Sequence, residues 1–145
     1  MNKLVVDASI AIKWVVREPG ADDAHKLLGD YSLSAPDLLT AECANILWKK
    51  VIRREISAEL ADAAAAALQQ LRIELVPMRS LMRAAAALAI EVDHPAYDCM
   101  YVALAEANDW SFATADERLI AKFRRIDPNR FGRRILSLSE AMAQG

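Results

Sequence analysis

Four carboxylates lie at positions where the neighbouring residues are apolar. Asp7 follows directly after the apolar stretch "LVV", and Asp116 follows "WSFATA" at residues 110–115. Glu42 lies within "LLTAECANIL" and Asp98 within "AYDCMYVALAEAN", two stretches with the periodicity of helices that have an apolar face. Since an unpaired buried carboxylate is costly, we expect each one to be neutralised, paired with a cationic side chain or bound to a metal ion.

Divalent metal binding is the chemistry that would use all four acids together. Carboxylates that converge without basic partners repel one another, and a hard divalent cation removes that repulsion. Mg²⁺ binds carboxylate oxygens while keeping several waters, so a site of this kind can activate water and stabilise the charge of a phosphodiester. The residues therefore predict a Mg²⁺ or Mn²⁺ site formed by Asp7, Glu42, Asp98 and Asp116.

Helix starts offer a simpler explanation for the two acids that follow strands. Asp7 could cap the helix after it. Thr114 and Glu117 have the T-x-x-E spacing of a capping box, and Asp116 could likewise support that helix N-terminus. The metal-site interpretation therefore depends on the four acids in combination.

The two acids within helices have structural alternatives as well. Glu42 could pair with a Lys or Arg side chain, and Asp98 could be a helix N-terminal acid after Pro95. Asn45 lies on the same helix face as Glu42, where it could bond the carboxylate or a substrate, or be solvated. These alternatives stay open at the level of sequence.

The elements that must position these acids alternate along the chain. Short strands are predicted at residues 3–6, 32–36, 73–77, 110–115 and 133–138. Helices are predicted at residues 9–16, 21–30, 37–54, 57–71, 80–92, 96–108 and 116–123, followed by a short terminal helix that "SLSE" could cap. This order predicts one α/β domain over residues 1–145, with a central parallel sheet covered by helices on both faces.

A parallel sheet would bring two of the four acids to one edge, while the other two lie within helices. The carboxyl ends of parallel strands meet at the same edge, and ligands of open α/β sheets bind outside it. Asp7 and Asp116 follow two different strands, so both are expected there. Glu42 lies on an apolar helix face, and Asp98 shares a helix face with Tyr101.

The composition excludes several other kinds of site. The four glycines are not clustered, which argues against P-loop and GxGxxG phosphate sites. Cys43 and Cys99 lack zinc-type spacing and are expected to be small buried residues in a reducing cytoplasm. His25 and His94 stand apart in sequence and are expected to be surface or capping residues. No apolar run approaches the ~18 residues of a membrane helix, so a cytoplasmic location is expected.

The distribution of basic residues is more informative than the net charge of −2. Seven of the 18 Lys and Arg residues fall between Arg118 and Arg134, where Asp127 is the one acid. Such clustering indicates either a nucleic-acid contact surface or a solvated basic edge. A second set of candidate phosphate contacts comprises Lys49, Lys50, Arg53 and Arg54.

Four stretches together resemble the PIN-domain family, and more narrowly the VapC-type toxin ribonucleases of prokaryotic type II toxin–antitoxin modules. The stretches are "VVDASIAIKW", "LLTAECANIL", "AYDCMYVALAEAN" and "FATADERL". Each is weak alone, but the four in this order span nearly the whole chain. The resemblance implies a PIN-like three-layer α/β/α fold with a central parallel sheet.

The resemblance also implies an activity and a set of partners. The activity is cleavage of RNA phosphodiester bonds by metal-activated water, with Asp7 and Asp98 as the most direct ligands and Glu42 and Asp116 completing the shell. The partners are the RNA substrate, a cognate antitoxin protein that obstructs the site, and a second copy of the toxin in a homodimer. Ser9 and Thr114 match small hydroxyl residues of the family, with helix capping as the alternative role for Ser9.

Three other classes of protein remain as alternatives. A phosphoacceptor receiver domain has an acidic pair after the first strand and an Asp after a central strand, whereas "IELVP" ends without one. A haloacid-dehalogenase-type phosphatase needs DxD where this chain has "DAS". A catalytically inactive PIN-like module that binds RNA or protein is the third, and the four intact acids argue against it.

Overall fold

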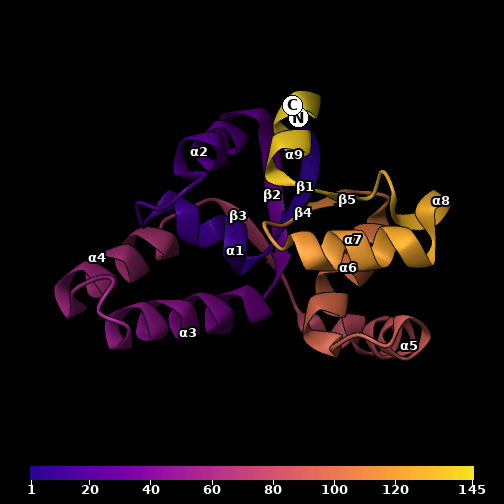
Figure 1. The fold of residues 1–145 in the computed structure, drawn as a ribbon, viewed down its shortest axis with the longest axis horizontal. Helices are drawn as coiled ribbons and strands as arrows, with labels where there is room; N and C mark the ends of the chain where they lie inside the picture. The colour runs from indigo at the N-terminus through magenta and orange to yellow at the C-terminus, as the bar shows by residue number, and fades with distance from the viewer.

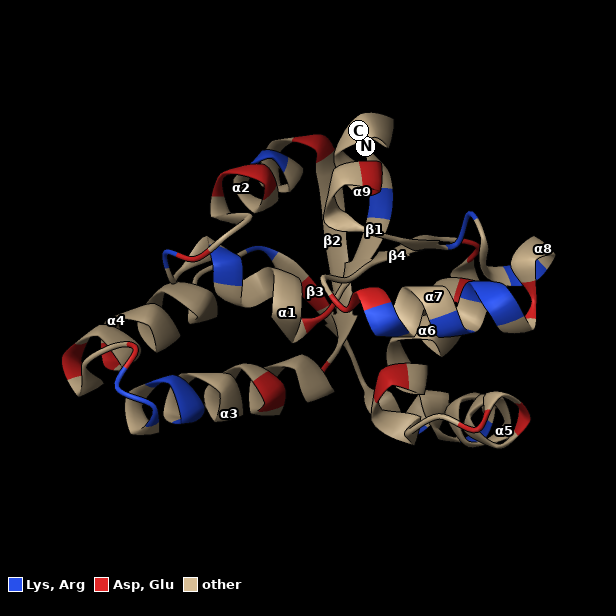
Figure 2. Ribbon diagram, in the orientation of Figure 1, with Lys and Arg blue, Asp and Glu red and all other residues tan.

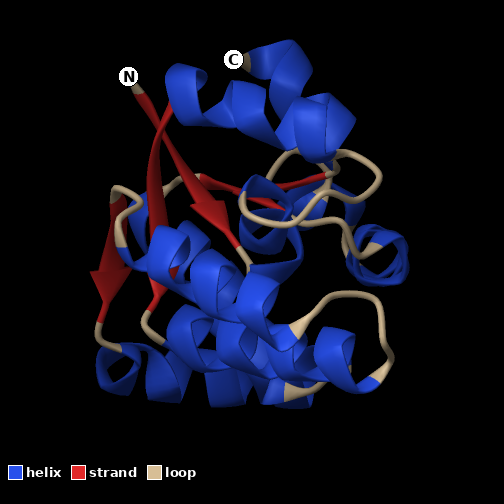
Figure 3. Ribbon diagram, turned by 90° about the vertical axis from the view of Figure 1, so that its left-hand side faces the viewer, coloured by secondary structure: helices blue, strands red, loops and turns tan.

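A computed structural model describes all 145 residues of the chain. At its centre is a five-stranded sheet in the order β3-β2-β1-β4-β5, in which every neighbouring pair is parallel. The strands are β1 (Asn2–Val6), β2 (Tyr31–Pro36), β3 (Ile73–Val76), β4 (Ser111–Ala113) and β5 (Ile135–Leu136). Helices flank this sheet, which confirms the predicted α/β/α fold (Figures 1 and 3).

The helices fall into two groups on either side of the central strands (Figure 1). One group comprises α1 (Ala8–Ala11), the 3₁₀ helix η1 (Ile12–Trp14), α2 (Ala21–Asp30), α3 (Leu38–Ile52) and α4 (Ala58–Gln69). The other comprises the 3₁₀ helix η2 (Met78–Leu81), α5 (Met82–Val92), α6 (Ala96–Asn108), α7 (Glu117–Ile126) and α8 (Pro128–Phe131), and α9 (Leu138–Gln144) ends the chain beside α2. No helix combines the length and hydrophobicity needed to cross a bilayer.

Most predicted elements are observed within a few residues of their predicted bounds, but one predicted helix differs in form and one observed turn was not predicted. The helix predicted at 9–16 is a short α-helix that continues as the 3₁₀ helix η1, in which the carbonyl of Ile12 accepts the N–H of Val15, three residues on, at 3.2 Å. The single turn α8 was not predicted; Pro128 begins it and the Asp127 carboxylate accepts the N–H of Arg130 at 3.0 Å.

Side chains cap the starts of two further helices, of which the terminal one was predicted from "SLSE". Ser57 accepts the N–H of Leu60 at the start of α4, and "SLSE" forms a full capping box in which Ser137 and Glu140 bond each other's backbone. Asp37 occupies the cap position of α3 without a bond to that helix; its carboxylate accepts the N–H of Met78 at 3.0 Å instead.

The core gives the carboxyl edge of the sheet a rigid base. Leu4, Val5 and Val6 of β1 are fully buried, and α6 packs against β1, β2 and β4. Tyr101 of α6 stacks on Phe112 of β4 with ring centroids 5.7 Å apart. Close packing of this kind restricts how far the side chains at the adjoining edge can move.

Candidate metal centre at the carboxyl edge of the sheet

Strand pairing brings Asp7 and Thr114 together. In the parallel pair of β1 and β4, Val6 lies opposite Ala113, so the chain leaves both strands at the same level. The Thr114 hydroxyl, which is fully buried, donates to Asp7 Oδ2 at 2.5 Å. One carboxylate oxygen of Asp7 is thus fixed by a residue more than one hundred positions away in the sequence.

The other oxygen of Asp7 caps α1. Asp7 Oδ1 accepts the N–H groups of Ser9 and Ile10, at 3.1 and 3.3 Å, and the Ser9 hydroxyl at 2.5 Å. The predicted capping role of Asp7 is therefore confirmed, and it is compatible with metal binding because carboxylate oxygens accept several bonds each. Ser9 also accepts the N–H of Ala115 at 2.9 Å, which ties α1 to the segment after β4.

Burial raises the pKa of Asp7 to about 6, because desolvation outweighs the hydrogen bonds from Ser9, Thr114 and Ile10 that favour the ionised form. The negative charge of Asp98 raises it further. No Lys or Arg side chain pairs with Asp7. A cation bound beside this carboxylate would restore its ionised form at neutral pH.

Glu42 of α3 accepts a hydrogen bond from the Tyr101 hydroxyl of α6, so the two helices meet at this carboxylate. Burial raises the pKa of Glu42, the Tyr101 bond lowers it, and the charge of Asp98 raises it again. The alternative of a Lys or Arg partner is wrong, since the only side chain bonded to Glu42 is that of Tyr101. Asn45 is exposed and has no hydrogen bond to this carboxylate.

Asp98 lies in the first turn of α6, as the structural alternative predicted, but it also has a specific partner. His94 Nε2 lies 2.7 Å from Asp98 Oδ2. The His94 side chain is 13% exposed and that of Asp98 is 35% exposed. The expectation that His94 is a surface or capping residue is therefore wrong, whereas His25 is exposed and contacts only the backbone carbonyl of Ala21 through a hydrogen bond.

Asp116 is exposed and begins α7. Its carboxylate accepts the N–H of Leu119 at 3.1 Å, so Asp116 is the N-cap of this helix. The predicted capping box between Thr114 and Glu117 is wrong, because the Thr114 hydroxyl lies before the helix, where it donates to Asp7 and accepts the N–H of Asp116 at 3.1 Å. Thr114 therefore links the turn that carries Asp116 to Asp7.

The helices α1, α3, α6 and α7 approach one another at the centre of the molecule, and Figure 2 shows acidic segments there before α1 and α7, which begin after Asp7 and Asp116. Asp98 raises the pKa of both Asp7 and Glu42, so these three charges act on one another. No three His, Cys, Asp or Glu side chains converge closely enough in the structure to outline a metal cluster. The donors nevertheless fit Mg²⁺ or Mn²⁺, since they are carboxylate oxygens without Lys or Arg partners.

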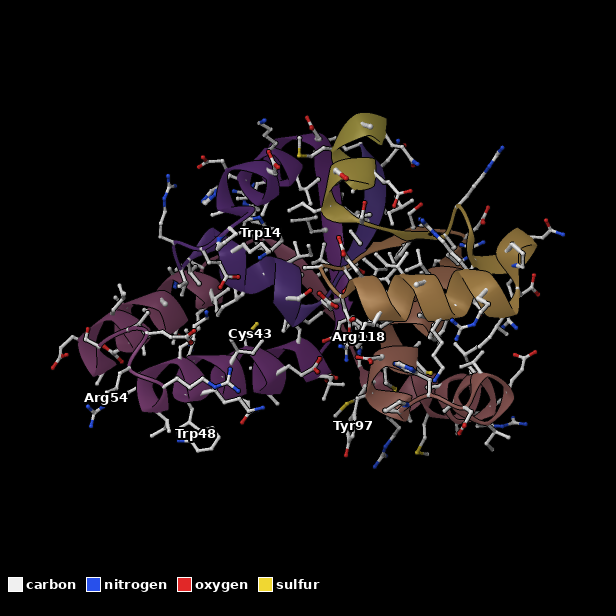
Figure 4. The ribbon with its side chains drawn as sticks, in the orientation of Figure 1. Trp14, Cys43, Trp48, Arg54, Tyr97 and Arg118 are labelled. Carbon is white, nitrogen blue, oxygen red and sulfur yellow. The ribbon has the colours of Figure 1, made fainter.

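The two cysteines next to these acids are inert residues of the interior. Burial raises the pKa of the Cys43 thiol to about 12 and that of Cys99 to about 11, so both stay protonated at neutral pH. Cys43 points from α3 toward α1, whereas Trp48 points away from the molecule (Figure 4). The expectation of small buried residues is confirmed for both cysteines.

Ion pairs occupy many of the basic residues that clustering had suggested as phosphate contacts. Arg124 pairs with Glu140, Arg130 with Glu91 and Glu106, Arg134 with Asp109, and Lys50 with Glu18. Arg118, Arg125 and Arg133 are exposed and have no acidic partner. Arg118 is of most interest because it lies in the first turn of α7, which Asp116 caps, and near the centre of the molecule in Figure 4.

Two side chains that bond the predicted ligands were not singled out from sequence as site residues. Tyr101 had been placed on the face of Asp98, and that spacing could have suggested a polar role for its hydroxyl. His94 lies four residues before Asp98, which is the spacing of neighbours on a helix. Pro95 lies between them and marks the start of the helix, so a contact between the two side chains was not expected. Lys122 contacts His94 from α7, and no local signal indicates that contact.

Comparison with known proteins defines the class of this fold and site. The PIN domain family profile matches residues 4–127. Ribonuclease VapC3 of Pyrobaculum aerophilum is 34% identical over 127 residues, which cover 83% of this chain and 95% of that protein. Ribonuclease VapC1 of Mycobacterium tuberculosis H37Rv is 36% identical over 123 residues, which cover 83% and 91%. The chain therefore belongs to the PIN-domain family.

Solved structures agree with this assignment at the level of the fold. The crystal structure of PAE2754 from Pyrobaculum aerophilum has a TM-score of 0.68 and 20% identity, and the match covers 99% of this chain and 88% of that one. VapBC2 from Rickettsia felis, bound to a DNA fragment from its promoter, has a TM-score of 0.66 and 14% identity, with 93% and 98% covered. Within the PIN family, the curated relatives place this chain with the VapC type.

Proposed function

We propose that this protein is a toxin endoribonuclease that cleaves RNA phosphodiester bonds at a Mg²⁺ or Mn²⁺ site formed by Asp7, Glu42, Asp98 and Asp116. The observation that carries the proposal is the environment of Asp7 and Glu42, whose pKa values are raised by burial and by the charge of Asp98 and which have no Lys or Arg partner. The VapC ribonucleases matched over 83% of the chain support the same reaction.

The chain's own residues would prepare this site by holding carboxylates in place. Thr114 and Ser9 hold the two oxygens of Asp7, and Tyr101 holds one oxygen of Glu42. When bound, the metal would lower the pKa of a water molecule and offset charge on the scissile phosphate. Arg118 would contact a neighbouring phosphate of the RNA.

Protein partners are the second part of the proposal. A cognate antitoxin would cover the acidic edge, and two copies of the chain would form a homodimer. Large apolar side chains are exposed and available for such contacts, and Trp48 and Tyr97 point outward in Figure 4. Light scattering on the purified chain is expected to report a dimer, and an equimolar antitoxin is expected to stop RNA cleavage.

The test of the reaction is cleavage of total cellular RNA by the purified, partner-free chain. We expect cleavage with Mg²⁺ or Mn²⁺, none with EDTA, and a loss of roughly 100-fold or more in Asp98→Asn. Asp62→Asn is the matched control, because Asp62 is exposed on α4 and has no ion pair. Metal-independent cleavage, or equal cleavage by Asp98→Asn, would contradict the proposal. A folded chain that binds metal without cutting any RNA would indicate the inactive PIN-like binding module instead.

A further inference from the structure

A chain of polar contacts runs from α7 to Asp98 through His94. Lys122 Nζ donates to the carbonyl of Asp93 at 2.5 Å and lies 3.3 Å from His94 Nδ1. On the other side of the ring, His94 Nε2 lies 2.7 Å from Asp98 Oδ2. Asp93 and His94 belong to the connection between α5 and α6, so these contacts join three helices beside one predicted ligand.

The chemistry of Lys122 determines which nitrogen of His94 carries the proton. An ammonium group has three donors and no acceptor. Nδ1 of His94 must therefore be the acceptor toward Lys122, and the proton of the neutral imidazole is placed on Nε2. From that position Nε2–H donates to Asp98 Oδ2.

The His94 ring is held on its other sides as well. It packs edge-on against the fully buried Phe123, with ring centroids 5.3 Å apart, and its side chain is 13% exposed. The partner oxygen of Asp98 is fixed by this ring, whereas Oδ1 of the same carboxylate has no hydrogen bond within the protein. The two oxygens of Asp98 are thus distinct: one is bonded inward and the other is available.

We propose that His94 is a positioning residue of the metal site, which holds Oδ2 of Asp98 so that Oδ1 binds the cation, and that Lys122 selects the tautomer His94 needs for this role. The inference deepens the proposed function and depends on it. Partners that orient a metal-binding side chain typically change metal affinity by about 10- to 100-fold when they are removed.

Metal affinity without RNA tests the role of His94 apart from cleavage. Free Mn²⁺ is counted by electron paramagnetic resonance while the partner-free chain is titrated. His94→Leu is expected to bind Mn²⁺ about 10-fold or more weakly, while His94→Gln, whose amide N–H can replace Nε2–H, stays within roughly threefold of the parent. The Mn²⁺ affinity of Lys122→Met is expected to lie between the affinities of these two variants. Thermal unfolding by circular dichroism verifies that each variant is folded.

The tautomer is tested separately in the metal-free chain. Two-bond ¹⁵N–¹H correlation spectra at pH 8 are expected to show His94 with its proton on Nε2, and Lys122→Met is expected to show a mixture of tautomers. A proton on Nδ1 in the parent, or parental Mn²⁺ affinity in folded His94→Leu, would overturn the role of His94 and leave the metal site standing. A folded parent that binds no Mn²⁺ would remove both the metal site and this role.

Discussion

Partly buried acids at the carboxyl edge of the sheet and those elsewhere on the molecule have opposite environments. Glu18 and Glu140, away from the edge, pair with Lys or Arg, and both have pKa values below the ordinary value; for Glu140 the backbone N–H of Ser137 lowers the pKa most and Arg124 lowers it further. Asp7 and Glu42, at the edge, have only hydroxyl and N–H donors, and both have raised pKa values. Ionised carboxylates therefore stabilise the fold where they pair with Lys or Arg, and destabilise it at the carboxyl edge.

Glu18 shows what pairing achieves. It accepts bonds from Lys13 at 3.0 Å and Lys50 at 2.8 Å, and so joins η1 to α3. Burial alone would raise its pKa, but the bonds from Lys50 and Lys13 outweigh that effect and the pKa is lowered. The edge acids lack such partners, and a site that must attract a divalent cation needs this unneutralised charge.

The largest expected effect is the loss of RNA cleavage when Asp7 is replaced, and it distinguishes the role of Asp7 as a ligand from its role as a helix cap. Asp7→Asn is expected to lower metal-dependent RNA cleavage by roughly 100-fold or more, because it removes a charged ligand while an Asn side chain still caps α1. Asp127→Asn is the matched control, since Asp127 caps α8 in the same manner without lying at the edge. Gel analysis of RNA fragments measures both variants. Equal loss in the two would mean that capping, not the ligand, matters.

The next effect concerns stability away from the edge. Glu18→Gln is expected to lower the free energy of unfolding by roughly 1–3 kcal/mol at pH 7, because it leaves Lys13 and Lys50 without their partner. Since the folded pKa of Glu18 is below the ordinary 4.5, the stabilising contribution is present above pH 4.5 and is lost as the pH falls through the lowered value. Urea unfolding at pH 7 and at lower pH measures the difference from the parent.

An exposed ion pair provides the control for Glu18. Glu74 pairs with Lys3 at 2.6 Å, but its side chain is 56% exposed. Glu74→Gln is therefore expected to lower the free energy of unfolding by less than Glu18→Gln does, because solvent screens an exposed pair. If both substitutions cost the same, partial burial of the Glu18 pair would have no special effect and the contrast with the edge would weaken.

The third expected effect is an increase in the free energy of unfolding, and it concerns Asp7 again. In the metal-free chain its folded pKa of about 6 lies above the ordinary 3.8, so between these values the folded state holds a proton that the unfolded state has released. The contribution of Asp7 to the free energy of unfolding therefore falls as the pH rises from 3.8 through 6. Relative to the parent, Asp7→Asn is expected to gain about 2 kcal/mol between pH 4 and pH 7.5.

Urea unfolding in EDTA measures this gain, because contributions from other titrating groups cancel in the difference between the two proteins. Excess Mn²⁺ is expected to reduce or reverse the advantage of Asp7→Asn, since binding stabilises the folded parent. A variant that loses stability relative to the parent over this pH range would show that the hydrogen bonds of Asp7 outweigh its burial.

The sequence predicted those parts of the site that depend on local order. An apolar strand followed at once by Asp7 places that acid at the carboxyl edge, and Pro95 before an apolar helical pattern fixed α6 at the observed residues 96–108. The Thr114–Asp7 bond could not be predicted, because it depends on the register between β1 and β4. The contact of Lys122 with His94 depends likewise on how α7 packs beside the α5–α6 connection.

The smallest expected effect tests whether hydroxyl donors at the edge serve the carboxylates rather than the fold. Tyr101→Phe keeps the stacking on Phe112 but removes the donor to Glu42, whose pKa is then expected to rise further. We expect a loss of about 1 kcal/mol in stability and a severalfold weaker affinity for Mn²⁺. Tyr31→Phe is the matched control.

Tyr31 is buried and donates to the carbonyl of Ala141 at 2.6 Å, between β2 and α9 and away from the acids. Its substitution is expected to cost similar stability, because it also leaves an acceptor without its donor, but to leave Mn²⁺ affinity unchanged. Equal Mn²⁺ affinities in the two variants would mean that the Tyr101 hydroxyl acts on the fold alone. A loss of Mn²⁺ affinity in Tyr101→Phe alone would show that the bond between α6 and α3 orients Glu42 for the cation. The acids elsewhere on the molecule, which pair with Lys or Arg, have no such role.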